Sequence, residues 1–438
     1  MSSLKSKIVK NLFWSVIGKM VQMMGGLVIG IMVARHLGPH DYGVMNYVIS
    51  FVFLFQTLSI FGLDNIEIRE EAKNETPREV IIGTAFTIKL CLAVLCVILC
   101  IGTSFLMDAS RETTLYVAIY SLSIIAQTFN VIRNHFMAIV QNRNVVLSEI
   151  NRTLIGMVIK GIMLWYGLPL IWFMAASTFD WVLLSSGYIV SYRSAIGRLR
   201  EWRFDATYAR KLLRESYPLL LTSAAVIMYQ KIDQVMIGQL IGNKEQVGYF
   251  ATASRFVEVL IYVPIMLAQT MSPVLVKIRH EQGEAIYRQR AQQFMNISIW
   301  TCMTMAVATS ICAYWIIRYT FGQDYLLAVP VLQVLAFKAA SVALSNTAGN
   351  MIIIEGLQRH VFIRDIMGCI VCITLNWYLL PRYDIIASAL VAIISNVTAG
   401  YIADALIPSY HHLFARQTKA LLIGWKDLIH IHQLVRRS

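Results

Sequence analysis

Charged residues are scarce in this chain. Only 14% of its 438 residues are Asp, Glu, Lys or Arg, whereas 57% are hydrophobic. A soluble protein of this length carries roughly 25% charged residues. The composition therefore excludes an ordinary soluble globular protein and indicates a chain that lies largely in lipid.

Catalytic and metal-binding motifs are also missing from the sequence. It contains no GxxxxGK loop for nucleotide hydrolysis, no HExxH zinc pair and no GxSxG nucleophile turn. The seven cysteines fall inside apolar stretches and show neither zinc nor disulfide spacing. We therefore expect no catalytic residues and no metal site, and we predict that the chain is not an enzyme.

Apolar stretches of about bilayer length fill most of the chain. A bilayer core is about 30 Å thick and takes about 20 helical residues to cross, and lipid offers the backbone no hydrogen-bond partners. The sequence therefore predicts an all-α polytopic membrane protein with about 12 transmembrane helices. The predicted helices are Leu12–Val33, Tyr42–Gly62, Val80–Met107, Leu115–Val140, Val145–Gly167, Pro169–Tyr192, Pro218–Ile241, Val247–Val274, Phe294–Tyr319, Ala328–Ile354, Val361–Leu380 and Ile385–Ile407.

The distribution of basic residues predicts the orientation of these helices. With the N-terminus inside, 24 of the 38 Lys and Arg residues fall in cytoplasmic segments, only five lie on the outer side and nine lie within helices. Cytoplasmic loops of membrane proteins carry such an excess of Lys and Arg, so we expect both termini to be cytoplasmic. The net charge of +13 is explained in this way, and no nucleic-acid partner is expected.

The longest basic loop divides the chain into two lobes of six helices. Residues 1–192 form the predicted N-terminal lobe, 193–217 a basic cytoplasmic linker and 218–413 the C-terminal lobe. Each lobe opens with a similar hairpin, IGIMVARHLGPHDYG at Ile29–Gly43 and IGQLIGNKEQVG at Ile237–Gly248, which suggests a parallel repeat. In residues 414–438, apolar and basic residues recur at helical spacing, which predicts an amphipathic cytoplasmic tail.

Three lysines lie deep within predicted helices. Lys19, Lys160 and Lys338 each fall on a stripe of polar residues at least two turns from either helix end, too deep for the side chain to reach water easily. Because a charge at mid-membrane costs roughly 2.5–3.5 kcal/mol on insertion scales, such residues usually face a polar interior. We predict that they line a substrate cavity together with Arg255 and Lys89. The alternative is that each lysine forms a structural ion pair with an acid of another helix.

Embedded acids are the second group of candidate site residues. Asp233, Glu258 and Asp180 lie within predicted helices, and each is expected to pair with a base or to take part in ion coupling. Asp233 is expected to pair with Lys231, Arg255 or another base, or to bind a coupling proton. By contrast, the basic residues nearer the cytoplasmic helix ends are expected to extend toward the interface; these are Arg133, Arg152 and Arg364.

The N-terminal region resembles a known family of transporters. Asn11–Val48, NLFWSVIGKMVQMMGGLVIGIMVARHLGPHDYGVMNYV, is similar to the opening of Wzx-type O-antigen and polysaccharide flippases, a branch of the MATE-like MOP superfamily. The segment FGLDNIEIRE at Phe61–Glu70 has the same character, with Arg69 after the second helix. The residues that carry the resemblance at the two hairpins are Leu37, Gly38, Gly43, Gly242, Gly248 and Tyr249.

The resemblance implies a fold and a function. It implies two lobes around a cationic cavity, alternating access, and transport of undecaprenyl-pyrophosphate-linked oligosaccharide across a bacterial inner membrane. It also implies membrane lipids as partners, together with the polymerase and chain-length regulator proteins of the same pathway. No cofactor is expected, although H⁺ or Na⁺ is a candidate coupling ion. The alternatives are a MATE-like multidrug or organic-ion exporter and a membrane polysaccharide polymerase or ligase.

Overall fold

The computed structural model describes residues 2–107 and 110–429, with side chains described from Gly18 onward except at 218–219, 221–223, 226–230 and 428–429. Within these residues the secondary structure consists of helices and their connections, without strands. The chain divides into two compact units, and the boundary falls within one helix: unit 1 ends at Ile227 and unit 2 begins at Met228.

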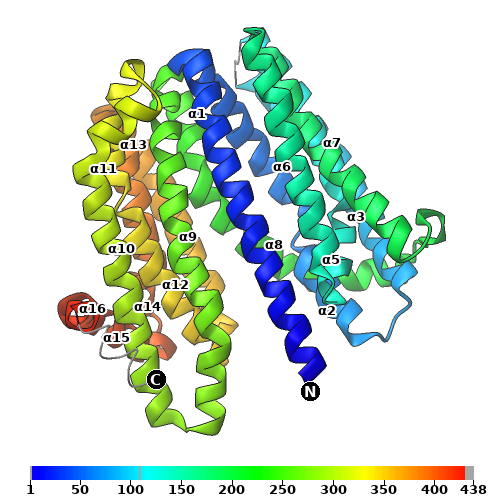
Figure 1. Ribbon diagram of the computed structural model, residues 1–438, viewed down its shortest axis with the longest axis vertical. Helices are drawn as coiled ribbons and strands as arrows, with labels where there is room; N and C mark the ends of the chain where they lie inside the picture. The colour runs from blue at the N-terminus through cyan, green and yellow to red at the C-terminus, as the bar shows by residue number, and fades with distance from the viewer. Residues whose placement is uncertain (1, 108–109, 430–438) are drawn as a thin grey trace. The chain divides into compact units, whose positions relative to one another are not determined.

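In its described residues, unit 1 contains seven helices and the first part of an eighth. Figure 1 shows how they are arranged. Its core gathers around the buried side chains of Ile66, Phe136 and Tyr188, which come from α2, α5 and α7. The helices are α1 (Ser2–Ile60), α2 (Leu63–Lys73), α3 (Arg78–Leu106), α4 (Arg111–Ala126), α5 (Asn130–Ala138), α6 (Asn142–Trp165), α7 (Leu170–Ala195) and α8 (Ala206–Met236), with short 3₁₀ turns η1 (Gln127–Phe129) and η2 (Leu199–Glu201).

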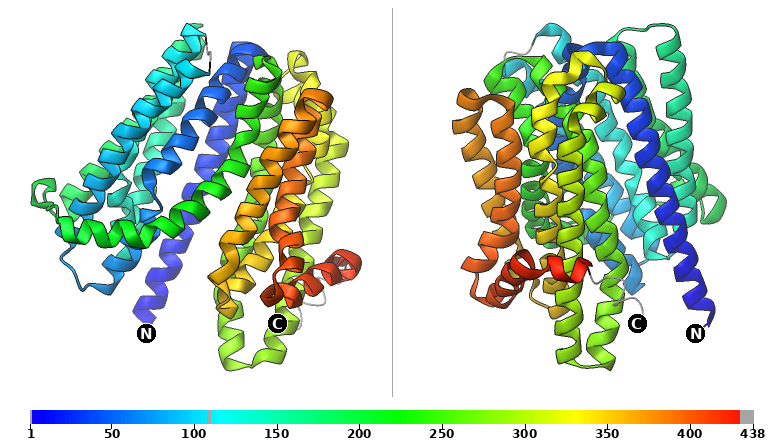
Figure 2. Two further views of the ribbon diagram at one scale, coloured as in Figure 1. Left: turned by 180° about the vertical axis from the view of Figure 1, so that it is seen from behind. Right: turned by 60° about the vertical axis from the view of Figure 1, so that its left-hand side comes forward.

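Unit 2 continues from α8 to the C-terminal region, where two short helices lie across its lower end (Figure 2). Its core includes the buried Tyr287, Met295, Leu344 and Tyr410. The elements are η3 (Ile237–Ile241), α9 (Lys244–Glu281), α10 (Glu284–Thr320), η4 (Gln323–Ala328), α11 (Val329–Leu335), α12 (Lys338–Glu355), η5 (Gln358–His360), α13 (Val361–Val397), η6 (Thr398–Ile402), α14 (Ala403–Leu406), η7 (Pro408–Tyr410), α15 (His411–Ile423) and α16 (Trp425–Ile429).

The all-α membrane fold is confirmed. In the described part of the chain, eight helical spans are long and apolar enough to cross a bilayer. Two of them, 18–73 and 358–406, each contain two of the predicted helices, so the eight spans cover ten of the twelve predictions. The other two predicted helices coincide with α6 and with α8 followed by η3.

The breaks inside the two longest helical spans fall where hairpins were expected. Gly38 interrupts α1 with φ 72° and ψ 173°, and Asp384 interrupts α13 with φ 62° and ψ −165°. Gly242 ends the first helix of unit 2 with φ 74°. Glycine suits the positions of Gly38 and Gly242 because it lacks a Cβ atom and so adopts a positive φ easily. The predicted glycine turn is therefore present in both units.

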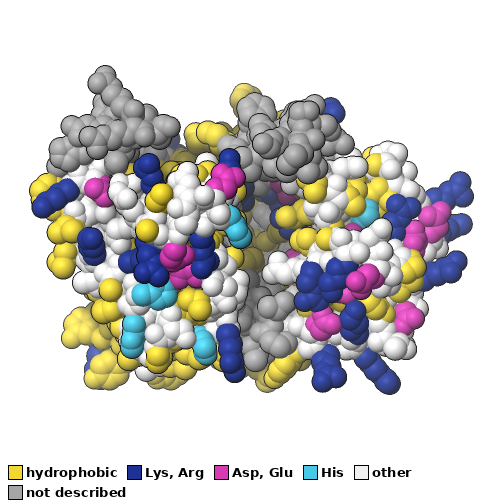
Figure 3. Space-filling view, turned by 90° about the horizontal axis from the view of Figure 1, so that it is seen from below, with side chains coloured by type: hydrophobic (Ala, Val, Ile, Leu, Met, Phe, Trp, Pro, Cys, Tyr) yellow, Lys and Arg dark blue, Asp and Glu magenta, His cyan; other side chains and the backbone are white. Residues whose placement is uncertain are grey.

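Charged side chains are numerous on the lower face of the molecule. Seen from below, Lys, Arg, Asp and Glu side chains are spread over this face among hydrophobic ones (Figure 3). In unit 1 the buried carboxylate of Glu70 accepts hydrogen bonds from Lys73 at 2.7 Å and Lys211 at 3.0 Å. The second contact ties α2 to α8, so residues of the predicted basic linker are partly built into the helices of unit 1.

Candidate functional site

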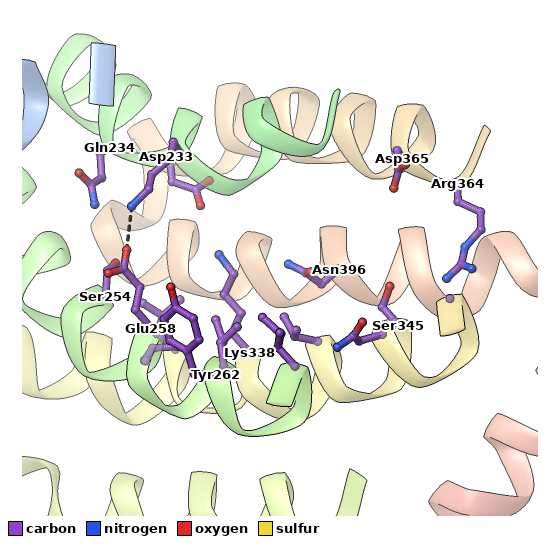
Figure 4. Close-up of a pocket in the computed structure, with 18 of the residues that line it drawn as sticks. Asp233, Gln234, Ser254, Glu258, Tyr262, Lys338, Ser345, Arg364, Asp365 and Asn396 are labelled. Carbon is purple, nitrogen blue, oxygen red and sulfur yellow. Dashed lines mark hydrogen bonds and ion pairs between the residues drawn. The ribbon is translucent and has the colours of Figure 1, made fainter. Parts of the chain in front are cut away.

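A cavity of about 560 Å³ lies inside unit 2, between α8, α9, α12 and α13 (Figure 4). Its volume is in the range of small-molecule binding pockets. The wall is mixed in charge rather than purely basic, because three basic and three acidic side chains line it. These are Lys231, Lys338, Arg364, Asp233, Glu258 and Asp365.

Lys338 occupies the first position of α12, directly after the turn that separates this helix from α11. Its ammonium group points into the cavity (Figure 4). Among the residues whose side chains are described, no carboxylate lies within 4 Å of this ammonium group. The predicted cavity lysine of unit 2 therefore presents its charge to the cavity and not to a structural partner.

Lys231 and Glu258 form an ion pair across the cavity wall. The Lys231 Nζ atom of α8 lies 2.7 Å from Glu258 Oε1 of α9 (Figure 4). Arg255 lies one turn before Glu258 on α9, and its guanidinium is 3.8 Å from the other carboxylate oxygen. The Glu258 carboxylate is thus shared by Lys231, which lines the cavity, and by Arg255, which is not among the cavity-lining residues.

Asp233 is held by neutral donors. Its side chain is 2% exposed, and Oδ1 accepts a hydrogen bond from Asn376 Nδ2 at 2.8 Å and from the Cys372 thiol at 3.4 Å. Asn376 and Cys372 stand one turn apart on α13. Within the described side chains, no base lies within 4 Å of the Asp233 carboxylate. Neither Lys231 nor Arg255 is its ion-pair partner.

Arg364 shows where the prediction of an interfacial side chain is wrong. The residue is 4% exposed, and its Nε atom lies 3.2 Å from Asp404 Oδ1. Nε also donates to the Ala399 carbonyl oxygen at 2.9 Å. Ala399 lies in the π-helical turn η6, whose wider geometry leaves carbonyl oxygens open to such donors. The guanidinium is therefore fixed within unit 2 because α13 and η6 supply its acceptors.

Neutral polar groups complete the cavity. Hydroxyl and amide groups between the charged residues offer both donors and acceptors, a combination suited to the hydroxyl groups of a sugar. They belong to Ser254, Tyr262, Ser345, Asn346 and Asn396.

Lys160 and Asp180 of unit 1 form an ion pair between α6 and α7. The Nζ–Oδ2 distance is 2.5 Å, and the side chains are 13% and 20% exposed. Gly156, one turn before Lys160, makes the approach possible, because a Cβ atom there would lie 2.5 Å from Asp180 Oδ1. Lys160 therefore forms an ion pair with an acid of another helix, which was the alternative to a place on the cavity wall.

Lys89 lies in a buried polar cluster of unit 1. Its ammonium is 2.6 Å from both Asp64 Oδ1 and Glu67 Oε1 of α2. Asn134 of α5 donates to the same two carboxylates, at 2.9 Å and 2.6 Å. Lys89 is 2% exposed, so its side chain ties α3 to α2 and α5.

Lys19 lies on α1 of unit 1 and is half-buried. Three residues later, Gln22 donates a hydrogen bond of 2.7 Å to Glu149 of α6. Arg133 lies 3.8 Å from the same carboxylate, and the Tyr188 hydroxyl donates to it at 3.3 Å. Gln22, on the same helix as Lys19, thus faces a polar neighbour in α6.

Sequence reasoning missed several partners of the predicted residues. The sequence did not indicate the roles of Asp64, Glu67 and Asn376. Their partners lie 22 to 143 positions away along the chain, so no local pattern links them. Glu67 and Asp64 do fall in the segment FGLDNIEIRE that carries the family resemblance. In the described part of the chain, no three His, Cys, Asp or Glu side chains cluster as a metal site requires.

Comparisons with solved structures show transporter folds over nearly the whole chain. A lipid II flippase, MurJ in an inward closed conformation, is 16% identical and covers 97% of this chain and 99% of its own, with a TM-score of 0.72. An inward-facing MATE-family multidrug resistance transporter of the MOP superfamily is 14% identical and covers 94% and 99%, with a TM-score of 0.69. A MOP superfamily transporter from Pyrococcus furiosus has a TM-score of 0.64 at 14% identity and covers 95% and 96%.

Comparison of the sequence with family models identifies the family. The comparison with curated protein sequences gave no match. The model described as polysaccharide biosynthesis protein matches residues 8–279, which is more than half of the chain and includes α1 to α9. The match spans the Lys160–Asp180 pair of unit 1 and the Lys231–Glu258 pair at the cavity of unit 2. This chain therefore belongs to the polysaccharide biosynthesis protein family, and its fold is that of the MATE-like transporters.

Proposed function

We propose that this protein is a flippase for undecaprenyl-pyrophosphate-linked oligosaccharide, the repeat unit of an O-antigen or of a capsular polysaccharide or exopolysaccharide. It moves this lipid from the cytoplasmic to the periplasmic leaflet of a bacterial inner membrane. The observation that carries the proposal is the cavity of unit 2, where the Lys338 ammonium faces hydroxyl and amide groups on the surrounding helices.

The cavity chemistry matches such a substrate in two ways. The lysine ammonium attracts a pyrophosphate or an acidic sugar, and attraction between charges is stronger in a cavity of low dielectric than in water. The hydroxyl and amide groups of Ser345, Asn346 and Asn396 can bond to sugar hydroxyls. Family membership and the likeness of the fold to a lipid II flippase support the same class of substrate.

Transport follows from alternating access. The cavity opens to one leaflet, accepts the headgroup while the polyprenyl chain stays in the bilayer, and then opens to the other leaflet. In this mechanism Lys338 and the pair Lys231–Glu258 bind substrate, and no covalent step is required. Asp233 is the candidate residue for coupling to H⁺ or Na⁺.

A MATE-like exporter of organic cations is the second candidate. The observation in its favour is the presence of Asp233, Glu258 and Asp365 on the cavity wall, because carboxylates attract cations. The two bases around Glu258 and the hydrogen bonds on Asp233 leave Asp365 as the acid best placed for this role.

Deletion of the gene in its native host distinguishes the two candidates. A flippase predicts that one lipid-linked repeat unit accumulates on the cytoplasmic leaflet and that surface polysaccharide is lost, with recovery on re-expression of the wild-type chain. An exporter predicts normal polysaccharide and greater sensitivity to organic cations. Normal surface polysaccharide in the deletion strain would contradict the flippase proposal.

A further inference from the structure

A second polar hollow, of about 740 Å³, lies in unit 2 between α10 and the tail helices α15 and α16. We call it the tail groove and define it by its charged residues Arg288, Arg416, Lys419, Lys426 and Asp427. Four of these side chains are basic and one is acidic. None of these residues lines the cavity described above, so the tail groove is a separate candidate site.

The two lysines of the tail groove keep their charge available. Arg288 pairs with Glu284 at 3.0 Å, and Arg416 lies 3.8 Å from Glu355. Lys419 and Lys426 are exposed, and among the described side chains neither has a carboxylate within 4 Å. Among the described side chains, the groove therefore has an excess of basic over acidic groups.

The groove is a built part of the fold. Trp300 Nε1 of α10 donates to the Ala420 carbonyl oxygen at 2.9 Å, and Gln292 Nε2 donates to the Arg416 carbonyl oxygen at 3.0 Å. The single carboxylate is occupied as well, since Asn296 Nδ2 lies 2.6 Å from Asp427 Oδ2. These bonds hold α15 and the start of α16 against α10 and fix the positions of the two lysines.

Exposed apolar side chains accompany the positive charge. On the tail helices Leu422 is 70% exposed, and Ile423 and Trp425 are each 43% exposed. Figures 1 and 2 show these helices lying crosswise to the long helices of unit 2, above the hairpin that joins α9 and α10. Apolar residues beside lysines on such a helix favour contact with the boundary between headgroups and acyl chains.

We propose that the tail groove binds the phosphate headgroup of an anionic phospholipid. Lys419 and Lys426 contact the phosphate, and Leu422 and Trp425 contact the adjoining acyl chains. Basic pockets at the cytoplasmic side of membrane proteins bind acidic headgroups in this way. The adjacent apolar residues favour a lipid over a soluble phosphate compound, which would gain nothing from them. The site does not depend on what the cavity transports.

The test measures lipid binding to the purified full-length chain by native mass spectrometry. Short-chain phosphatidylglycerol is titrated against the wild type, with phosphatidylcholine as the neutral comparison. The wild type should bind phosphatidylglycerol more tightly. The double variant Lys419→Gln/Lys426→Gln should lose roughly five- to thirtyfold in affinity, the effect of two surface lysines near anionic lipid.

Matched variants decide what a loss means. Lys277→Gln/Arg359→Gln removes the same charge from exposed residues of unit 2 outside the groove and should change affinity less than twofold. Lys419→Arg/Lys426→Arg keeps the charge and should bind phosphatidylglycerol like the wild type. If this variant also loses affinity, the loss comes from altered folding at these positions and not from the missing charge. An equal loss in the control pair, or equal binding of both lipids, would overturn the proposal.

The headgroup alone distinguishes a lipid from a soluble ligand. Glycerol 3-phosphate carries the same phosphate without acyl chains and should compete only weakly with phosphatidylglycerol. If it binds with the affinity of the lipid, the groove is a site for soluble phosphate compounds and the lipid assignment is wrong.

Discussion

The Lys160 ammonium lies 2.5 Å from the Asp180 carboxylate, across two neighbouring helices of unit 1. The contact depends on Gly156, since any larger residue there would place its Cβ atom against the Asp180 side chain. Lys338, by contrast, lines a cavity, and no described carboxylate lies within 4 Å of its ammonium group. Two lysines with similar sequence surroundings therefore have different environments, and substitutions should affect them differently.

Gly156→Ala is expected to destabilise the protein. The added methyl group forces α6 and α7 apart or displaces Asp180, and overpacking of this kind costs about 1–3 kcal/mol. The measurement is the thermal unfolding temperature of the purified protein in detergent. Gly161→Ala is the control, because it lies on the same helix and nothing lies within 4 Å of the place that its added methyl group would take. The control should be neutral or stabilising by up to about 1 kcal/mol, and equal losses at both sites would contradict the role of Gly156.

Removing Lys160 alone should cost more than removing the pair. Lys160→Met leaves the Asp180 carboxylate unpaired in surroundings that are only 20% exposed, which destabilises by roughly 3–5 kcal/mol when a pair is fully buried. Lys160→Met/Asp180→Leu should recover most of the unfolding temperature. Failure of the second change to restore any stability would indicate that Lys160 acts elsewhere than in this pair.

Lys338→Gln should abolish transport while leaving the protein in the membrane. A charge pair at about 4 Å is worth about 4 kcal/mol at an effective dielectric constant of 20. Each step of about 1.4 kcal/mol is a factor of ten, so a loss of up to roughly a thousandfold is expected. Lys338→Arg retains the charge and should keep much of the activity. Surface polysaccharide and membrane protein level are measured together in a deletion strain, and full polysaccharide with Lys338→Gln would show that this lysine does not bind substrate.

Accessibility to water should separate the cavity from the helix interior. In a chain without native cysteines, Lys338→Cys should react with a small water-soluble thiol reagent, because the position lines the cavity. A chain that retains only Cys372, which is 0% exposed, should remain unlabelled. Labelling is followed by mass shift, and an inert Cys at position 338 in a folded protein would place Lys338 away from water.

The two hairpin glycines should differ in the substitutions that they accept. Gly38 has φ 72° and ψ 173°, a region in which residues other than glycine are strained, so Gly38→Asn should cost about 1–3 kcal/mol. Gly242 has φ 74° and ψ −2°, close to the left-handed helical region that Asn adopts more readily, so Gly242→Asn should cost less. Unfolding temperatures of the two variants test the difference, and an equal loss would contradict it.

Much of the fold could be predicted from the sequence because lipid restricts the possible structures. A backbone without water must form helices, so hydropathy alone placed the twelve helical stretches from Leu12 to Ile407. The turn at Gly38 was visible because glycine, which lacks a Cβ atom, adopts a positive φ more readily than any other residue. The sequence likewise showed that Lys338 lies deep within an apolar stretch.

Which side chains meet was decided by tertiary structure alone. Helical spacing shows which residues share a face of one helix, but it does not show which helix lies opposite that face. Lys160 therefore meets Asp180 and Lys89 meets Asp64, whereas Lys338 meets a cavity. For the same reason Asp233 accepts from Asn376, 143 residues away on α13, and not from the lysine two positions before it. The sequence by itself determined the membrane fold and the deep charges; packing between helices decided which charges pair and which remain open to a ligand.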